Sequence, residues 1–220
     1  RIGGFAGVDR AYVFVLSPDG QRARNTHEWC GEDITSHKDA MQDVPCDDYR
    51  WWFEQLRLFR NIHVTSLSEL PAEAAPELAL FQAQEVQSVI SVPLVAAARL
   101  IGFLGFDSVR QRANWTEESI ALLTIVGEML AGAIERRRFD LANRRALSLL
   151  RSTLESTADG ILVVDREGRI VSSNRRFAEL WRIPWSVVES RDEGQALRSA
   201  VEQLRSPDQF LSDLRGLHEQ

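Results

Sequence analysis

The stretch NWTEESIALLTIVGEMLAGAIERRRFDLANRRALSLLRSTLES, residues 114–156, decides how the chain is organised, because it predicts one uninterrupted helix between two differently patterned segments. Thr116 is a good N-cap residue, and Trp115 and Ile120 have the spacing of a hydrophobic staple around it. The next strong helix breaker is the pair Asp159-Gly160. About 40 residues that rise about 1.5 Å each give a helix of about 60 Å. Because this is long for a globular domain, we expect a connector helix.

The connector carries a heptad seam that is apolar at both ends and polar in its middle. Alternating steps of four and three residues give the seam Leu122, Val126, Met129, Ala133, Arg136, Asp140, Asn143, Leu147, Leu150 and Leu154. Such a seam needs a partner helix, so we expect a coiled coil and a parallel homodimer. The polar centre has two interpretations. Either it sets register and orientation, or it gives the coil two arrangements of similar energy that a signal can switch.

Composition and charge argue against several kinds of partner. The formal net charge of −6 and the pI near 5.3 give no general attraction to nucleic acid, and Arg136–Arg138 and Arg144-Arg145 are typical of a solvated helix face. No apolar run reaches the roughly 18 residues that span a membrane, and no signal peptide is recognisable, so we expect a cytoplasmic protein without membrane insertion in this segment. The missing initiator methionine indicates a piece of a longer chain.

Before the connector, the pattern predicts an α+β domain. A β-rich run over residues 11–16 is followed by the turn Ser17-Pro18-Asp19-Gly20 and a returning strand. Further strands are expected over 62–64, 89–94 and 100–106, and helices after Asp47 or Asp48 and over 71–85. The strand over 100–106 is apolar on both faces, which is typical of a central strand covered on each side. We therefore expect a central antiparallel sheet flanked by helices.

The returning strand is the best candidate for a ligand site. Under strict alternation Asn25, His27 and Trp29 share one face, and a few polar groups among aromatic side chains are how small-molecule pockets are built. We expect a cavity between the sheet and the helices, with the candidate lining residues Asn25, His27, Trp29, Cys30, Trp51 and Phe81. The alternative is a filled core that holds no ligand.

After the connector the pattern changes to a second, smaller unit. A hairpin is predicted over residues 161–172, with its turn at Asp165–Gly168, and Asn174 is expected to cap a short helix. Two more short helices are expected after Ser186 and Ser206. Because one hairpin with three helices covers its sheet poorly, the second unit looks cut short.

Several of these motifs, taken in order, resemble the GAF domains of bacterial signalling proteins. The stretches that carry the likeness are Arg10-Ala11-Tyr12-Val13-Phe14, Asn25-Thr26-His27-Glu28-Trp29-Cys30, Ser91-Val92-Pro93-Leu94, Gly102-Phe103-Leu104-Gly105-Phe106-Asp107 and Trp115-Thr116-Glu117-Glu118. Residues 157–183, with Ala158-Asp159-Gly160-Ile161 and Asn174-Arg175-Arg176-Phe177, are similar to the opening of a PAS domain. The resemblance implies a GAF-like domain over 1–138, a coiled connector over 139–156 and a partial PAS-like domain over 157–220 that lacks its C-terminal strands.

The resemblance also raises the question of cofactors. Some GAF domains attach a bilin through cysteine or hold haem through histidine, and Cys30 and His27 are the nearby candidates. Neither lies in the phytochrome-like cysteine-histidine context, and the Asn-Lys-Phe-Asp-Glu signature of cyclic-nucleotide GAF domains is not recognisable. The spacing of His27, Cys30, His37 and Cys46 does not match paired zinc ligands. We expect no haem, bilin or metal, and the identity of any ligand stays open.

No residue pattern points to catalysis. The acidic residues Asp39, Asp43, Asp47 and Asp48 lack a converging base, nucleophile or metal signature, so loop and N-cap roles are expected. The resemblance implies the sensory input module of a bacterial signal-transduction protein. Such a module binds a small molecule or dimerises, and it relays its state to an output domain such as a histidine kinase or a diguanylate cyclase. The alternative is a dimerisation scaffold without a ligand.

Overall fold

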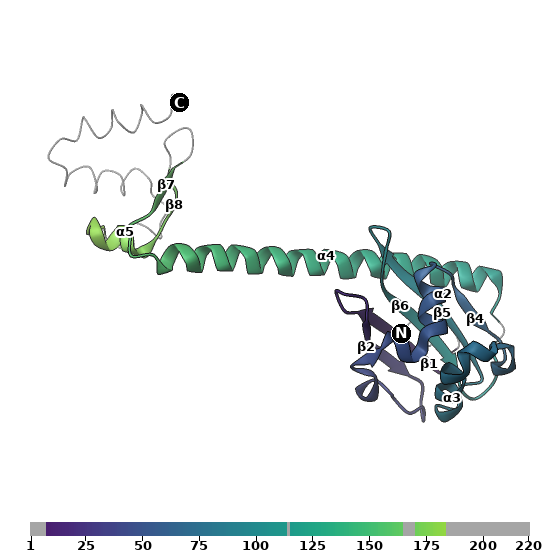
Figure 1. The fold of residues 1–220 in the computed structure, drawn as a ribbon. Coiled ribbons are helices and arrows are strands. Elements are labelled where there is room, and N and C mark those ends of the chain that lie inside the picture. Colours follow the sequence, from purple (N-terminus) through teal and green to yellow (C-terminus); the bar gives the residue numbers. More distant parts are fainter. Residues whose placement is uncertain (1–7, 114, 165–169, 184–220) are drawn as a thin grey trace. The chain divides into compact units, whose positions relative to one another are not determined.

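The computed structural model describes residues 8–113, 115–164 and 170–183. The chain divides into two compact units, residues 1–139 and residues 140–220. The first unit is built on a six-stranded sheet with the strand order β3-β2-β1-β6-β5-β4 (Figure 1). Its strands are β1 (Arg10–Leu16), β2 (Arg22–Cys30), β3 (Val44–Pro45), β4 (Ile62–Val64), β5 (Ser88–Ala96) and β6 (Arg99–Ser108). Every neighbouring pair is antiparallel, which confirms the expected α+β sheet.

β6 is the central strand that its apolar pattern predicts. It lies between β1 and β5, and every residue of β6 after Arg99 is buried. Gly105 is required there because a Cβ at this position would lie 2.1 Å from Cε2 of Tyr12 on the neighbouring strand. The small residue therefore leaves room for the Tyr12 ring at this position.

Helices cover both faces of this sheet, and each face has its own apolar core. One face carries α2 (Arg50–Arg57) and α3 (Ala75–Ala83), and its core includes Leu56, Phe81 and Phe103. Four short 3-10 segments complete this layer: η1 (Asp39–Met41), η2 (Cys46–Tyr49), η3 (Leu67–Glu69) and η4 (Ala72–Ala74). The opposite face packs against the first part of the long helix α4 (Glu117–Ser156), through a core that includes Phe106 and Leu123.

A bulge in β2 changes which of its side chains share a face. The register passes from the pair Val13 and His27 to the pair Phe14 and Asn25, so Thr26 is an extra residue that the register with β1 skips. An extra residue reverses the alternation of side chains beyond it. Asn25 therefore faces the α2–α3 layer, whereas His27 faces the opposite side, and the expectation that they share a face is wrong.

The long helix α4 begins as predicted and spans 40 residues. The Thr116 hydroxyl accepts a hydrogen bond from the Ser119 N–H at 3.2 Å, which is the N-cap interaction, and Trp115 is buried in the core under the sheet. Leu123, Gly127 and Ala131 form the buried stripe of the helix. A Cβ on Gly127 would lie only 3.0 Å from Cγ1 of Val92, so the glycine allows a close approach of helix and sheet.

The heptad seam of α4 is largely exposed. The large apolar side chains Leu122, Met129, Leu147 and Leu150 are 57%, 70%, 59% and 62% exposed, and Ala133 is exposed as well. Val126 packs partly against the sheet-side core, and Leu154 is half-buried. The polar seam residues Arg136, Asp140 and Asn143 are exposed.

The second unit contains the predicted hairpin and helix. β7 (Leu162–Val164) and β8 (Ile170–Ser173) pair in antiparallel fashion, and α5 (Arg175–Leu180) follows. The Asn174 side chain caps α5 through the Phe177 N–H (2.9 Å) and donates to the Leu154 carbonyl at the end of α4 (2.9 Å). The predicted turn at Asp165–Gly168 and the helices expected after Ser186 and Ser206 lie outside the described residues.

Candidate functional site

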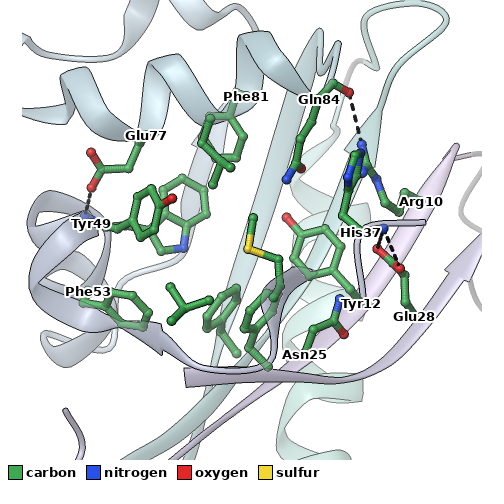
Figure 2. Close-up of a pocket in the computed structure, with 16 residues that line it drawn as sticks. Arg10, Tyr12, Asn25, Glu28, His37, Tyr49, Phe53, Glu77, Phe81 and Gln84 are labelled. Atoms are coloured by element: carbon green, nitrogen blue, oxygen red, sulfur yellow. Dashed lines mark hydrogen bonds between the residues drawn. The ribbon is translucent and has the colours of Figure 1, made fainter. Parts of the chain in front are cut away.

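A cavity of about 70 Å³ lies between the sheet and the α2–α3 layer (Figure 2). Seven of its sixteen lining residues are Phe, Tyr or Trp, and they come from the sheet, from η2 and α2, and from α3. They are Tyr12, Phe14, Phe103, Tyr49, Trp52, Phe53 and Phe81. Phe14 and Phe103 stack with ring centroids 4.7 Å apart, and Trp52 meets Phe81 edge to face at 5.3 Å. The wall is therefore a set of interlocked rings that gives an apolar molecule a defined shape to fill.

A buried ion pair stands beside this cavity. Arg10 lines the cavity, and its Nε lies 3.3 Å from Oδ2 of Asp107, with both side chains about 2% exposed. Tyr12 donates its hydroxyl to Oδ1 of Asp107 at 2.8 Å, and Arg10 Nη2 donates to the Gln84 carbonyl at 3.3 Å. Burial raises the pKa of Asp107 to about 6, although Arg10 and the Tyr12 hydrogen bond act against this rise. Burial and the Asp107 charge raise the pKa of Tyr12 in turn.

Glu77 joins the two helices that cover the cavity. Its side chain is buried, and Oε1 accepts the Trp52 N–H at 3.0 Å in the first turn of α2. A carboxylate at a helix N-terminus satisfies an otherwise unpaired N–H and interacts favourably with the helix dipole. Glu77 therefore fixes the position of α2 against α3 as shown in Figure 2.

The segment between β2 and β3 closes one side of the cavity, and Glu28 holds it in place. The Glu28 carboxylate accepts the N–H groups of His37 (3.1 Å) and Lys38 (2.8 Å) and the Ser36 hydroxyl. Arg10, His37 and Gln84 line both the cavity and a surface depression next to it. Figure 2 shows these three side chains together at one side of the cavity, so the cavity and the depression are neighbours at this side.

Four buried polar atoms that belong to lining residues have no hydrogen-bond partner among the described residues. They are Nε and Nη1 of Arg10, Oδ1 of Asn25 and Oε2 of Glu77, and Nε of Arg10 is in ion-pair contact with Asp107. Buried polar groups are normally paired, so a group of unpaired ones around one cavity needs a physical reason.

Two of the six predicted lining residues, Asn25 and Phe81, line this cavity. His27 is exposed and its Nδ1 lies 2.9 Å from the Thr26 hydroxyl, while Trp29 packs with the core on the other side of the sheet. The bulge at Thr26 is the reason for both positions. Cys30 pairs with Arg10 across the strands and does not line the cavity.

Trp51 is also outside the lining: it is half-buried and lies next to Trp52, which takes the inward position. The sequence analysis did not predict that Arg10 and Glu77 line the cavity. The spacing of Glu77 and Phe81 is the signal that places Glu77 on the inner side of α3, because residues four apart share a helix face. For Arg10 the signal is alternation with Tyr12 and Phe14 along β1.

The residues that the structure describes contain neither a cluster of metal ligands nor a helix that could cross a membrane. Within them, no three His, Cys, Asp or Glu side chains converge as a metal site. No helix in the same ranges combines the length and apolar character needed to cross a membrane.

The profile of the GAF domain family matches residues 1–134, well over half of the chain. The chain belongs to the GAF family. A PAS domain profile matches residues 148–216, so the GAF domain is followed by a PAS domain, as the resemblance implied. GAF and PAS domains are sensory rather than catalytic units, and the chain is a sensory signal-transduction module.

The GAF domain has a relative among histidine kinases. The methanogenesis regulatory histidine kinase FilI of Methanothrix harundinacea (strain 6Ac) is 26% identical over 135 residues, which is 60% of this chain and 15% of that protein. The chain thus spans a small part of that kinase.

Solved GAF structures share the fold at low sequence identity. The blue-light absorbing form of the PixJ GAF domain of Thermosynechococcus elongatus has a TM-score of 0.55 at 18% identity, over 66% of this chain and 85% of that one. A far-red absorbing dark state with bound biliverdin IXa has a TM-score of 0.52 at 14% identity, over 61% and 84% of the two chains.

The last of these structures corrects the expectation about bilins. We excluded a bilin because Cys30 and His27 lack the phytochrome-like context, but the fold of this chain is one that holds biliverdin in another protein. The local motif was therefore too narrow a criterion. In this GAF domain the lining of the 70 Å³ cavity contains no cysteine, and a tetrapyrrole would enter it with displacement of lining side chains. Biliverdin belongs among the ligands to be tested.

Proposed function

We propose that the GAF domain binds a small molecule in the cavity between the sheet and the α2–α3 layer. The observation that carries this proposal is the set of unpaired buried atoms on Arg10, Asn25 and Glu77 around one aromatic-walled cavity. Leaving such groups unpaired costs about 1–3 kcal/mol each. A ligand with matching donors and acceptors recovers part of that cost on binding, which gives the cavity a thermodynamic reason to be occupied.

The chain dimerises along the exposed seam of α4 and relays its state through that helix. Exposed apolar side chains at heptad spacing are typical of a helix that packs against a second copy. The same helix packs on the sheet through Leu123 and receives the Asn174 hydrogen bond at Leu154. The output domain is a histidine kinase or a diguanylate cyclase, and the kinase relative favours the first. The module itself is not an enzyme.

A ligand search tests the binding proposal. Mass spectrometry of small molecules released from purified protein should find a compound at near-stoichiometric amount. Val44→Phe puts bulk into the cavity from β3 and should abolish its retention, while Val95→Phe, a half-buried β5 position outside the lining, should retain it. Added biliverdin, followed by absorbance, tests the bilin. If wild type carries nothing and binds nothing, the rival function, a ligand-free scaffold, replaces this one.

Substitutions in the polar centre of the seam test whether α4 relays the state of the GAF domain. Exposed Arg136, Asp140 and Asn143 stabilise a coil less than leucine, so two arrangements can differ by a few kcal/mol, which a ligand can bridge. Replacing all three by Leu in the full-length protein should keep the dimer and lock the output against its stimulus. If the triple variant responds over the same range as wild type, these residues only set register.

A further inference from the structure

Arg10 is the cavity residue whose hydrogen-bonding capacity is least used. Nη2 donates to the Gln84 carbonyl, and Nε lies 3.3 Å from the Asp107 carboxylate. Nη1 has no partner among the described residues, and the side chain is 1% exposed, so bulk water does not reach it. A guanidinium matches a carboxylate in shape as well as in charge, because its N–H groups form a planar fork.

We propose that the ligand is a short-chain carboxylate whose carboxylate group accepts the Arg10 Nη1 hydrogen bonds and whose hydrocarbon tail lies among the aromatic rings. The proposal rests on the proposed function, because it names the class of molecule that the cavity holds. The head group lies at the side that Arg10, His37 and Gln84 share with the surface depression. The tail points inward, where Phe14, Phe103 and Phe81 form the wall.

The size of the cavity limits the length of the tail. Its volume of about 70 Å³ is roughly half of the 150 Å³ or so that accepts benzene in an engineered apolar cavity. A tail of about three or four carbon atoms fills such a space. Each methylene group of the tail that leaves water makes binding more favourable. A longer or aromatic acid would have to displace lining side chains.

The neighbouring Asp107 makes binding depend on pH. A second carboxylate at Arg10 would share one cation with Asp107, and this raises the pKa of Asp107 above its value of about 6 in the free protein. Binding is therefore coupled to proton uptake, and affinity rises as pH falls from about 7.5 to about 5.5. Tyr12, Glu28, Cys30 and His37 lie near the Arg10–Asp107 pair. Raised pKa values keep Tyr12 and Cys30 uncharged in this pH range, and burial lowers the pKa of His37 from its usual 6.5.

Calorimetry on the whole chain with butyrate tests the proposal, with butyramide and butanol as uncharged probes of the same length. We expect butyrate to bind at least about tenfold more tightly than butyramide, as for a charge-assisted bond, and several-fold more tightly at pH 5.5 than at pH 7.5. Removing Arg10 alone leaves Asp107 buried without its cation, so the test variant is Arg10→Met with Asp107→Leu. It should lose the preference for butyrate and keep weak binding of butanol, while Arg99→Met, an exposed arginine on β6, should behave as wild type.

Equal binding of butyrate and butyramide would overturn the proposal, as would butyrate binding that survives in the double variant. So would a cavity that contains buried water only and binds none of the three probes. These results are distinct from a failure of the proposed function. If mass spectrometry finds a compound without a carboxylate that Val44→Phe excludes, small-molecule binding is supported and the carboxylate proposal is wrong. If it finds none, and no added compound binds, both fall.

Discussion

The Tyr12 hydroxyl donates a 2.8 Å hydrogen bond to Oδ1 of Asp107, a residue 95 positions further along the chain. The bond ties β1 to the end of β6, and both groups are buried. Tyr12→Phe removes a bond to an ionisable group and should lower the free energy of unfolding by about 1.5–3 kcal/mol, measured by urea denaturation. Tyr49→Phe is the matched control, because no hydrogen bond of the Tyr49 hydroxyl is found in the described part of the chain. Similar losses in both variants would contradict this role.

The pKa of Asp107 makes part of the stability pH-dependent. Burial raises this pKa from 3.8 to about 6, so between these values the folded state holds a proton that the unfolded state releases. The contribution to stability is full below about pH 3.8 and is lost as pH rises through about 6, and it amounts to about 3 kcal/mol. Urea denaturation at a series of pH values should show the stability of wild type relative to Asp107→Asn falling across this window. A difference that is constant with pH would refute the shift.

Replacing both partners of the buried pair should be far less harmful than replacing one. Arg10→Met or Asp107→Leu alone leaves an unpaired buried charge and should cost about 3–5 kcal/mol. The double variant removes both charges but leaves the buried Tyr12 hydroxyl without its acceptor, so it should lie about 1–3 kcal/mol below wild type, far less than the sum of the two single losses. Thermal and urea denaturation of the four proteins give the coupling energy. If the two single losses simply add, the charges do not depend on each other.

Substitution by alanine should change the stability in opposite directions at Gly105 and Gly132. A Cβ at Gly105 meets the buried Tyr12 ring at 2.1 Å, so Gly105→Ala should cost about 1–3 kcal/mol through overpacking and should disturb the Tyr12–Asp107 bond. Gly132 lies within α4 with nothing within 4 Å of its Cβ position, so Gly132→Ala should stabilise by about 0.5–1 kcal/mol. Melting temperatures that move in the same direction for both variants would rule out this explanation.

Two adjacent leucines of α4 allow the seam to be compared with the rest of the helix surface. Leu150 is on the seam and Leu149 is off it, and the two are 62% and 69% exposed. Leu150→Asp should weaken the proposed homodimer at least about tenfold, because it would bury an unpaired carboxylate between the helices. Leu149→Asp should leave the dimer constant within about twofold. Light scattering over a range of concentrations measures both. A monomeric wild type, or equal effects of the two changes, would exclude this interface.

Short sequence motifs were enough to predict the helices and strands whose ends and buried faces depend on residues close by in the chain. Thr116 starts α4 and Asn174 starts α5 through hydrogen bonds to residues three positions ahead, so both caps are readable from short motifs. β6 was predicted as the central strand because its apolar run admits no solvated face. These inferences needed no knowledge of where distant parts of the chain lie.

The candidate site depended on contacts between distant segments. Composition does not reveal the bulge at Thr26, which arises in the pairing of β1 with β2, and this one extra residue sends His27 and Trp29 to the opposite side from Asn25. Arg10, in turn, becomes a candidate ligand-binding residue through its contacts with Asp107 of β6 and with the carbonyl of Gln84 after α3. Side-chain alternation and helix caps are local, so the sequence by itself determined the architecture. Strand register and the pairing of buried charges are set by long-range packing, and only the tertiary structure decided which residues surround the cavity.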